Sequence, residues 1–192
     1  MWKERLPEIC RPYDQKDIFN LDESGLLYRA LLDVRGTDCQ GGKRSEERLT
    51  AMLCVNMKGE FEKPLIIGRC EKPHCFKWIN TKVLPIIWKS NKRAWMTAAL
   101  FKEWLEKFNE KMRRQKRNVI LFLDNATCYP PLELSYVKLV FFPPNTSHLQ
   151  PMNQEIIKTM KTHYRQMLLR KVIKDVENGG QKTNVSVLDA CL

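Results

Sequence analysis

The hydrophobic pattern of the chain is organised around one short run, residues 119–123 (VILFL). Five apolar residues follow the polar pair Arg117-Asn118 without a break and end on Asp124. A continuous apolar run of this length is typical of a strand that is buried on both faces of a sheet. Because open α/β sheets bind ligands at the carboxyl ends of their strands, we expect Asp124 at a ligand-binding edge.

Four other apolar segments predict further strands around this run. They are residues 17–22, 49–56, 64–68 and 136–142. The first ends on Asp22, so a second carboxylate is expected at a strand end. A turn at Lys58-Gly59 predicts that the second and third strands form a hairpin. Pro143-Pro144 end the last strand, because proline has no amide hydrogen for the sheet.

Two segments have the three- and four-residue spacing of amphipathic helices. Thr97 is a favourable N-cap for the first helix. Its predicted apolar face consists of Phe101, Trp104, Leu105, Phe108 and Met112. The second helix is predicted from Asn153 to about Asp175. Its predicted buried stripe consists of Ile156, Met160, Tyr164, Met167, Leu168 and Val172.

This order of strands and helices predicts an α/β domain with a mixed sheet flanked by helices. Residues 1–16 are polar and contain Pro7 and Pro12, so we expect them to be an incoming connector. Residues 17–178 are predicted to form the domain. Residues 179–192 begin with Gly179-Gly180 and are interpreted as a truncated C-terminal tail.

The composition of the chain favours a polyanionic partner. Its 192 residues include 33 Lys and Arg against 22 Asp and Glu, which gives a net charge of +11. Such an excess favours nucleic acid as the partner, although a merely basic soluble protein has the same charge excess. Seven Cys without a C-x-x-C pair indicate free thiols in a reducing compartment. No apolar run approaches the ~20 residues of a membrane span, so no membrane partner is expected.

Two groups of cations are candidate DNA-phosphate ligands. The first group ends the first predicted helix and consists of Lys111, Arg113, Arg114, Lys116 and Arg117. Cations also complement the dipole at a helix C-terminus, but five in seven residues exceed what that requires. The second group lies on one face of the second helix and consists of Lys158, Lys161 and Arg165.

The tryptophans and one Cys-His cluster leave alternatives open. Trp78, Trp88, Trp95 and Trp104 stand among lysines and either stack on bases or pack in the core, of which core packing is the stronger expectation. Cys70, His74 and Cys75 either bind zinc or are free groups. The second interpretation is favoured because the spacing lacks a C-x-x-C knuckle and a fourth ligand.

Five motifs occur in order along the chain. They are residues 20–26 (NLDESGL), 41–50 (GGKRSEERLT), 121–126 (LFLDNA), 142–146 (FPPNT) and 149–152 (LQPM). These motifs resemble those of the pogo and Tigger-type DDE transposases, a family related to the jerky and centromere protein B group. The resemblance implies an RNase H-like fold, a nuclear setting and DNA as partner. It also implies a DNA-reading region N-terminal to this domain, for which this sequence shows no helix pair.

In this family, as the resemblance implies, three acids hold two divalent metals for DNA cleavage. Two Mg²⁺ about 4 Å apart stabilise the attacking and leaving oxygens of a phosphodiester. Asp22 and Asp124 match the first and second acids, so they are the expected metal ligands of a weak or vestigial site. The third acid is replaced, because residues 151–155 read PMNQE and place Asn153 where the family has Asp.

Further departures surround the same site. Tyr129 stands where the family usually has His after the second acid. Glu155 lies two residues beyond Asn153, about 200° around a helix, and is expected to point away. Glu23 alternates to the opposite side of its strand from Asp22. Cys128 is not a credible nucleophile, because a neighbouring anion raises the pKa of a thiol.

These features favour a domesticated DDE domain that is nuclear, binds DNA through its phosphates and lacks nuclease activity. No cofactor is expected, or Mg²⁺ if activity remains. Two alternatives stay open at this point: an active metal-dependent endonuclease or transposase, and a protein-interaction scaffold that no longer binds DNA.

Overall fold

The computed structural model describes residues 2–28, 48–144, 150–179 and 185–191. Residues 41–47 of the second motif, 145–146 of the fourth and 149 of the fifth lie outside these ranges. The described residues form two compact units. The first unit consists of the described residues within Met1–Glu23, Met52–Pro64 and Met96–Glu155. The second unit consists of the described residues within Ser24–Ala51, Leu65–Trp95 and Ile156–Leu192.

Six strands form one mixed sheet in the order β4-β3-β2-β1-β5-β6. The strands are β1 (Ile18–Leu27), β2 (Arg48–Asn56), β3 (Leu65–Gly68), β4 (Ile87–Ser90), β5 (Val119–Leu123) and β6 (Val137–Phe141). β5 is parallel to both of its neighbours, β1 and β6, and β3 is parallel to β4. The predicted α/β class with a mixed sheet is therefore confirmed.

The described residues also form the α-helices α1 (Trp2–Cys10), α2 (Ala98–Arg114), α3 (Ile157–Glu177) and α4 (Val187–Cys191). A π-helix, Met152–Ile156, leads into α3. Short 3-10 helices lie at Gln15–Asp17, His74–Phe76 and Thr81–Val83. No described helix combines the length and the apolar character that crossing a bilayer requires.

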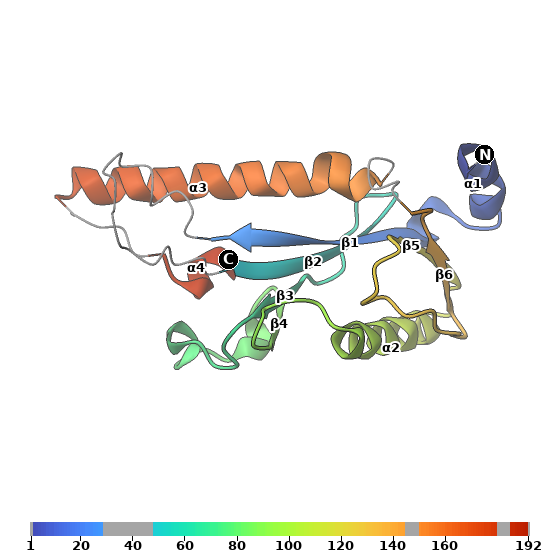
Figure 1. Ribbon diagram of the computed structural model, residues 1–192, viewed down its shortest axis with the longest axis horizontal. Helices are drawn as coiled ribbons and strands as arrows, with labels where there is room; N and C mark the ends of the chain where they lie inside the picture. The colour runs from blue at the N-terminus through green and yellow to red at the C-terminus, as the bar shows by residue number, and fades with distance from the viewer. Residues whose placement is uncertain (1, 29–47, 145–149, 180–184, 192) are drawn as a thin grey trace. The chain divides into compact units, whose positions relative to one another are not determined.

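The first unit is layered around β1, β5 and β6 (Figure 1). All five residues of β5 are buried, as its apolar run predicts. On one face, residues of α1 such as Trp2 and Leu6 pack against Ile120 and Phe122. On the other face, α2 packs through Phe108. The first unit thus has helices on both faces of its strands, and the predicted connector contains one of them.

The predicted apolar face of α2 is confirmed. The Thr97 hydroxyl caps this helix by accepting the amide hydrogen of Leu100 at 3.3 Å. All five predicted face residues are buried, and the ring of Phe108 meets that of Phe19 in β1 with centroids 5.3 Å apart. The predicted hairpin is confirmed as well. Gly59 has φ +81°, which favours glycine, and Val55 and Phe61 form an antiparallel bridge beside it.

The predicted buried stripe of α3 is wrong in part. Only Ile157 and Leu168 of this helix are buried, and Met167 is 57% exposed. Leu168 packs in the core of the second unit, and Tyr164 on the same stripe donates its hydroxyl hydrogen to the carbonyl of Tyr28 at 2.7 Å. Met167 lies one residue earlier, about 100° around the helix, and therefore faces solvent.

The second unit has its own core, which includes residues of the predicted tail. Val185 and Cys191 are buried there together with Tyr28, Leu168 and Ile66. Cys191 belongs to α4, which ends the described part of the chain. Residues 69–96 have no clear sequence period, and the strand β4 within them was not predicted.

Candidate functional site

The register between β1 and β5 brings the two predicted acids together. Asn20 is paired with Phe122, and Ile18 with Ile120, in parallel. Two residues beyond the pair of Asn20 and Phe122, the same offset places Asp22 level with Asp124, which follows directly on β5. Neighbouring strands lie about 4.8 Å apart, and residues at the same level of parallel strands point to the same face. The two carboxylates therefore lie on one face, that of Asp124 directly after β5 and that of Asp22 in the middle of β1. The predicted end of the first strand at Asp22 is wrong, because β1 continues to Leu27.

The two carboxylates differ in environment. Asp22 is 3% exposed and accepts the backbone amide hydrogen of Glu23 at 2.8 Å. Asp124 is half-buried, and this burial raises its pKa above the ordinary value, against the effect of hydrogen bonds from the backbone amides of Ala126 and of Asp124 itself. Since burial disfavours its charged form, a nearby cation would stabilise the Asp124 carboxylate.

The third predicted position lies in the π-helix Met152–Ile156, which contains Asn153. The amide of Met152, one residue before Asn153, donates to Asn20 Oδ1 at 3.2 Å. Asn20 Nδ2 in turn donates to the carbonyl of Phe122 in β5 at 3.0 Å. The side chain of Asn20 thus joins the three segments that carry Asp22, Asp124 and Asn153.

Sequence reasoning assigned no role to Asn20. Asn20 is the first residue of the NLDESGL motif. The available signal was its position two residues before Asp22 in an apolar strand, which places both polar side chains on the same face. A polar side chain on the face of a buried strand requires partners, and here the partners are the other two site segments.

We expect Asn20→Ala to lower the free energy of unfolding by about 1–3 kcal/mol, because the Phe122 carbonyl and the Met152 amide each lose a partner. Chemical denaturation measures this change. The exposed Lys138→Ala in β6 is the control and should stay within about 0.5 kcal/mol of the wild type. A loss for Asn20→Ala as small as the control's would show that the side chain does not hold the three segments.

Glu23 and Cys128 meet on the other side of β1. The Cys128 thiol donates to Glu23 Oε1 at 3.5 Å. Burial, followed by the Glu23 charge, raises the pKa of the Cys128 thiol to about 12. The expectation that Cys128 is not a nucleophile is therefore confirmed, since a thiol of this pKa stays protonated at neutral pH. Glu155 is exposed on the π-helix.

Tyr129 fills the position where a histidine was expected from the family. Its side chain is 3% exposed, and its ring contacts that of Phe101 with centroids 4.6 Å apart. Its hydroxyl oxygen is buried and has no hydrogen-bond partner among the described residues. Burial raises the pKa of Tyr129 far above its ordinary range, and the Glu23 charge adds to this. Tyr129 is thus a neutral packing residue beside the acids.

The donor set suits one divalent cation better than two. Two carboxylates offer hard oxygen ligands, and water fills the remaining positions of Mg²⁺. Two-metal phosphodiester chemistry needs more anionic ligands between and around its ions. Among the residues that the structure describes, no group of three or more His, Cys, Asp or Glu could hold a metal ion. The zinc interpretation of Cys70, His74 and Cys75 is therefore wrong, and both cysteines are free.

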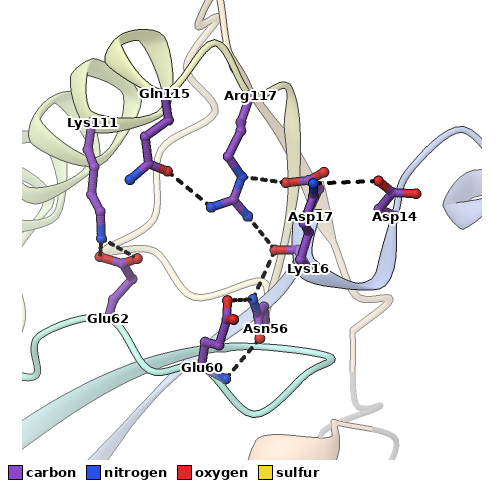
Figure 2. Close-up of polar contacts among 9 residues, drawn as sticks. All are labelled: Asp14, Lys16, Asp17, Asn56, Glu60, Glu62, Lys111, Gln115 and Arg117. Carbon is purple, nitrogen blue, oxygen red and sulfur yellow. Dashed lines mark hydrogen bonds and ion pairs between the residues drawn. The ribbon is translucent and has the colours of Figure 1, made fainter.

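The predicted DNA-binding run at the end of α2 is tied to acids from elsewhere in the first unit (Figure 2). Lys111 Nζ lies 2.6 Å from a carboxylate oxygen of Glu62. Arg117 Nε lies 2.6 Å from Asp17 Oδ1, and its terminal nitrogen donates to the carbonyl of Lys16 at 2.6 Å. These two cations stabilise the fold around the start of β1, and their charges are partly offset.

Two more cations of the same run share one acid. Arg113 and Arg114 contact the two oxygens of Glu110 at 2.6 and 2.9 Å. Their hydrogen bonds lower the pKa of Glu110 to about 2. The α3 cations differ, because Lys158, Lys161 and Arg165 form no salt bridge with a described acid. DNA binding by either group stays a prediction, with the more available charge on α3.

Comparison with known proteins identifies the family. The family model for the DDE superfamily endonuclease matches residues 46–191. This chain belongs to the DDE superfamily endonuclease family. It is 41% identical to Tigger transposable element-derived protein 4 of Mus musculus over 96% of the chain. It is 29% identical to Major centromere autoantigen B of Homo sapiens over 91% of the chain. The resemblance to Tigger/pogo-type proteins is therefore confirmed.

The DDE family assignment agrees with the fold. The Mos1 transposase, in its paired-end complex with left transposon end, has a similar structure with a TM-score of 0.54, 13% sequence identity, and coverage of 83% of this chain and 46% of that one. The predicted RNase H-like fold is thereby confirmed. The chain spans 37% of the length of the mouse Tigger relative and 29% of the human centromere autoantigen.

Proposed function

We propose that this chain is a domesticated DDE domain that binds DNA in the nucleus and has no nuclease activity. The observation that carries the proposal is the donor set at the carboxyl end of β5 and beside it in the middle of β1. Asp22 and Asp124 are level there, and the segment tied to them by Asn20 supplies Asn153 in place of an acid. A site built for two metals then lacks one unit of compensating charge.

DNA as the partner is supported by charge and by relatives. The net charge of +11 favours a polyanion. The structural neighbour was solved with a transposon end, and the human relative is a centromere autoantigen, which supports the nucleus as the location. Binding through phosphates is independent of DNA sequence and strongly dependent on salt. The cations of α3 are the strongest candidates because described acids leave them unpaired.

We expect duplex DNA affinity to fall linearly with salt on logarithmic axes, by about 0.9 per phosphate contacted. Replacing Lys158, Lys161 and Arg165 together by Gln should reduce the slope by about 2–3. The matched triple replacement of Lys111, Arg113 and Arg114 by Gln removes the same charge. Its effect should be smaller, because acids already offset those cations.

Fluorescence anisotropy with a labelled 20-base-pair duplex, from low to moderate salt, measures both slopes. Affinity that does not change with salt would contradict the proposal and favour the protein-interaction scaffold. Equal slopes for wild type and the α3 variant would show that the α3 cations do not contact the DNA phosphates.

A further inference from the structure

The segment from Arg69 to Trp95 in the second unit carries most of the uncompensated charge of the chain. It holds seven Lys or Arg and one acid, Glu71, so it contributes +6 of the net charge of +11. Six of the seven cations are exposed: Arg69, Lys72, Lys77, Lys82, Lys92 and Arg93. Within the described part of the chain, none of these six forms a salt bridge. At the end of α2, by contrast, four of the five cations are paired with acids.

Two tryptophans of the same segment are exposed. Trp78 is 89% exposed and Trp95 is 53% exposed. The other two tryptophans for which base stacking was considered are packed. Trp104 is buried in the core, and Trp88 packs against Phe76 with ring centroids 5.0 Å apart. Core packing therefore explains only half of this group. A large exposed aromatic ring is unfavourable in water and is typical of a binding surface.

Each exposed ring has a cation beside it. Lys77 Nζ lies 5.1 Å from the ring centroid of Trp78, and the guanidinium carbon of Arg48 lies 5.4 Å from that of Trp95. A base that stacks on such a ring brings its phosphate within reach of the neighbouring cation. Surfaces that bind single strands without sequence preference combine these two features.

The Trp95 platform is held in place by Asn91. The Asn91 side chain donates to the carbonyl of Trp95 at 2.6 Å and accepts its amide hydrogen at 3.2 Å. The amide of Asn91 donates to the carbonyl of Gly68 in β3 at 3.0 Å, which anchors this loop to the sheet. These bonds hold the backbone of Trp95, so less conformational entropy is lost at this position when a ligand stacks on the ring.

A pocket of about 430 Å³ lies in the same unit. Its lining includes Arg48, Arg69, His74 and Trp88. The Nε atom of Arg48 is buried and has no hydrogen-bond partner among the described residues. Two arginines in one lining, Arg48 and Arg69, favour an anionic oxygen in the pocket.

We propose that the second unit binds single-stranded DNA, with Trp78 and Trp95 stacking on bases and the pocket at Arg48 and Arg69 taking a backbone phosphate. The residues of this surface are different from the α3 cations of the proposed duplex contact. Paired bases in a duplex are already stacked on each other and do not offer their faces, so the two surfaces favour different forms of DNA.

The test is the binding of the whole chain to labelled dT20 at fixed, moderate salt, measured by anisotropy. Trp78→Ala and Trp95→Ala should each weaken binding by roughly 5- to 100-fold, from the ~1–3 kcal/mol of one base-stacking contact. Trp78→Phe keeps a ring and should retain most of the affinity. Val83→Ala, in the same segment and 74% exposed, is the control and should change nothing.

An abasic strand of the same length separates stacking from charge. Neither tryptophan variant should alter its binding, whereas Arg69→Gln should weaken the binding of dT20 and of the abasic strand alike. The tryptophan variants should leave duplex binding unchanged, and the α3 variant should lower it, so failure of one proposal is distinguishable from failure of the other. Unchanged dT20 affinity in both folded tryptophan variants overturns the inference. At least tenfold tighter binding of rU20 than of dT20 would overturn the assignment to DNA.

Discussion

Supercoiled plasmid is expected to stay intact when this chain is incubated with Mg²⁺ or Mn²⁺, and Asp124→Ala is expected to behave like the wild type. The reason is the charge at the site. Asp22 and Asp124 supply two negative charges against the four positive charges of two divalent ions, and Asn153 supplies none. A second metal is then not held where the leaving oxygen requires it.

Asn153→Asp should raise Mn²⁺ affinity by roughly tenfold or more, since even outer-shell partners of metal ligands are worth 10–100-fold. The new carboxylate would also lie in the turn that leads into α3, where a helix N-terminus favours anions. Isothermal titration calorimetry with Mn²⁺ measures this gain. Asn153→Gln is the matched control, because it changes the side chain without adding charge and should leave affinity unchanged.

The double variant with Asn153→Asp and Asp124→Asn should lose the gain in metal affinity, which would show that both side chains act on one ion. One result would overturn our account of the site. If the wild type nicks plasmid efficiently and Asp124→Ala abolishes nicking, another oxygen completes the site, and Glu155 is the first to test. Nicking that survives Asp124→Ala would point to a contaminant.

Tyr129→Ala is expected to lower the free energy of unfolding by about 3–5 kcal/mol, as removal of a buried aromatic ring does. The ring is 3% exposed and packs on Phe101, which is itself fully buried, so the site cannot collapse easily around the cavity. Urea denaturation followed by circular dichroism measures this loss.

Tyr129→Phe separates the ring from the hydroxyl. It removes only the oxygen that has no hydrogen-bond partner among the described residues, so the free energy of unfolding should stay the same or rise by up to about 1 kcal/mol. A loss above about 1 kcal/mol would show that the hydroxyl has a partner, such as water, and that Tyr129 is more than a packing residue.

The hydrophobic pattern predicted an element correctly wherever it was compatible with only one buried face. Five apolar residues in β5 leave no polar face, and the spacing of Phe101, Leu105 and Phe108 in α2 defines a single face. In α3, apolar residues occupy more positions than one stripe can hold, so tertiary contacts at Tyr164 and Leu168 decide which are buried. β4 is four residues long and half-buried, and its pairing with β3 spans about 20 residues that show no period.

The candidate site was predicted in part, where its residues belong to local sequence patterns. Asp22 and Asp124 were found because each ends an apolar run within a recognised motif. The pairing of Lys111 and Arg117 was missed because their partners are distant in sequence: Glu62 is 49 residues from Lys111, and Asp17 is 100 residues from Arg117. Sequence spacing reports charges that are close along a helix, and it carries no information about acids brought in by another strand.

The hydrogen bond between Asn20 and Met152 has a consequence for how this site changes over generations. Asn20 holds the third site segment through a backbone amide, which any residue except proline supplies at that position. This bond does not depend on which side chain follows at position 153. A single-nucleotide change from an aspartate to an asparagine codon therefore removes a metal ligand and leaves this attachment intact. Chemistry and folding can drift apart at this position, and a lineage can keep the domain after the reaction has gone.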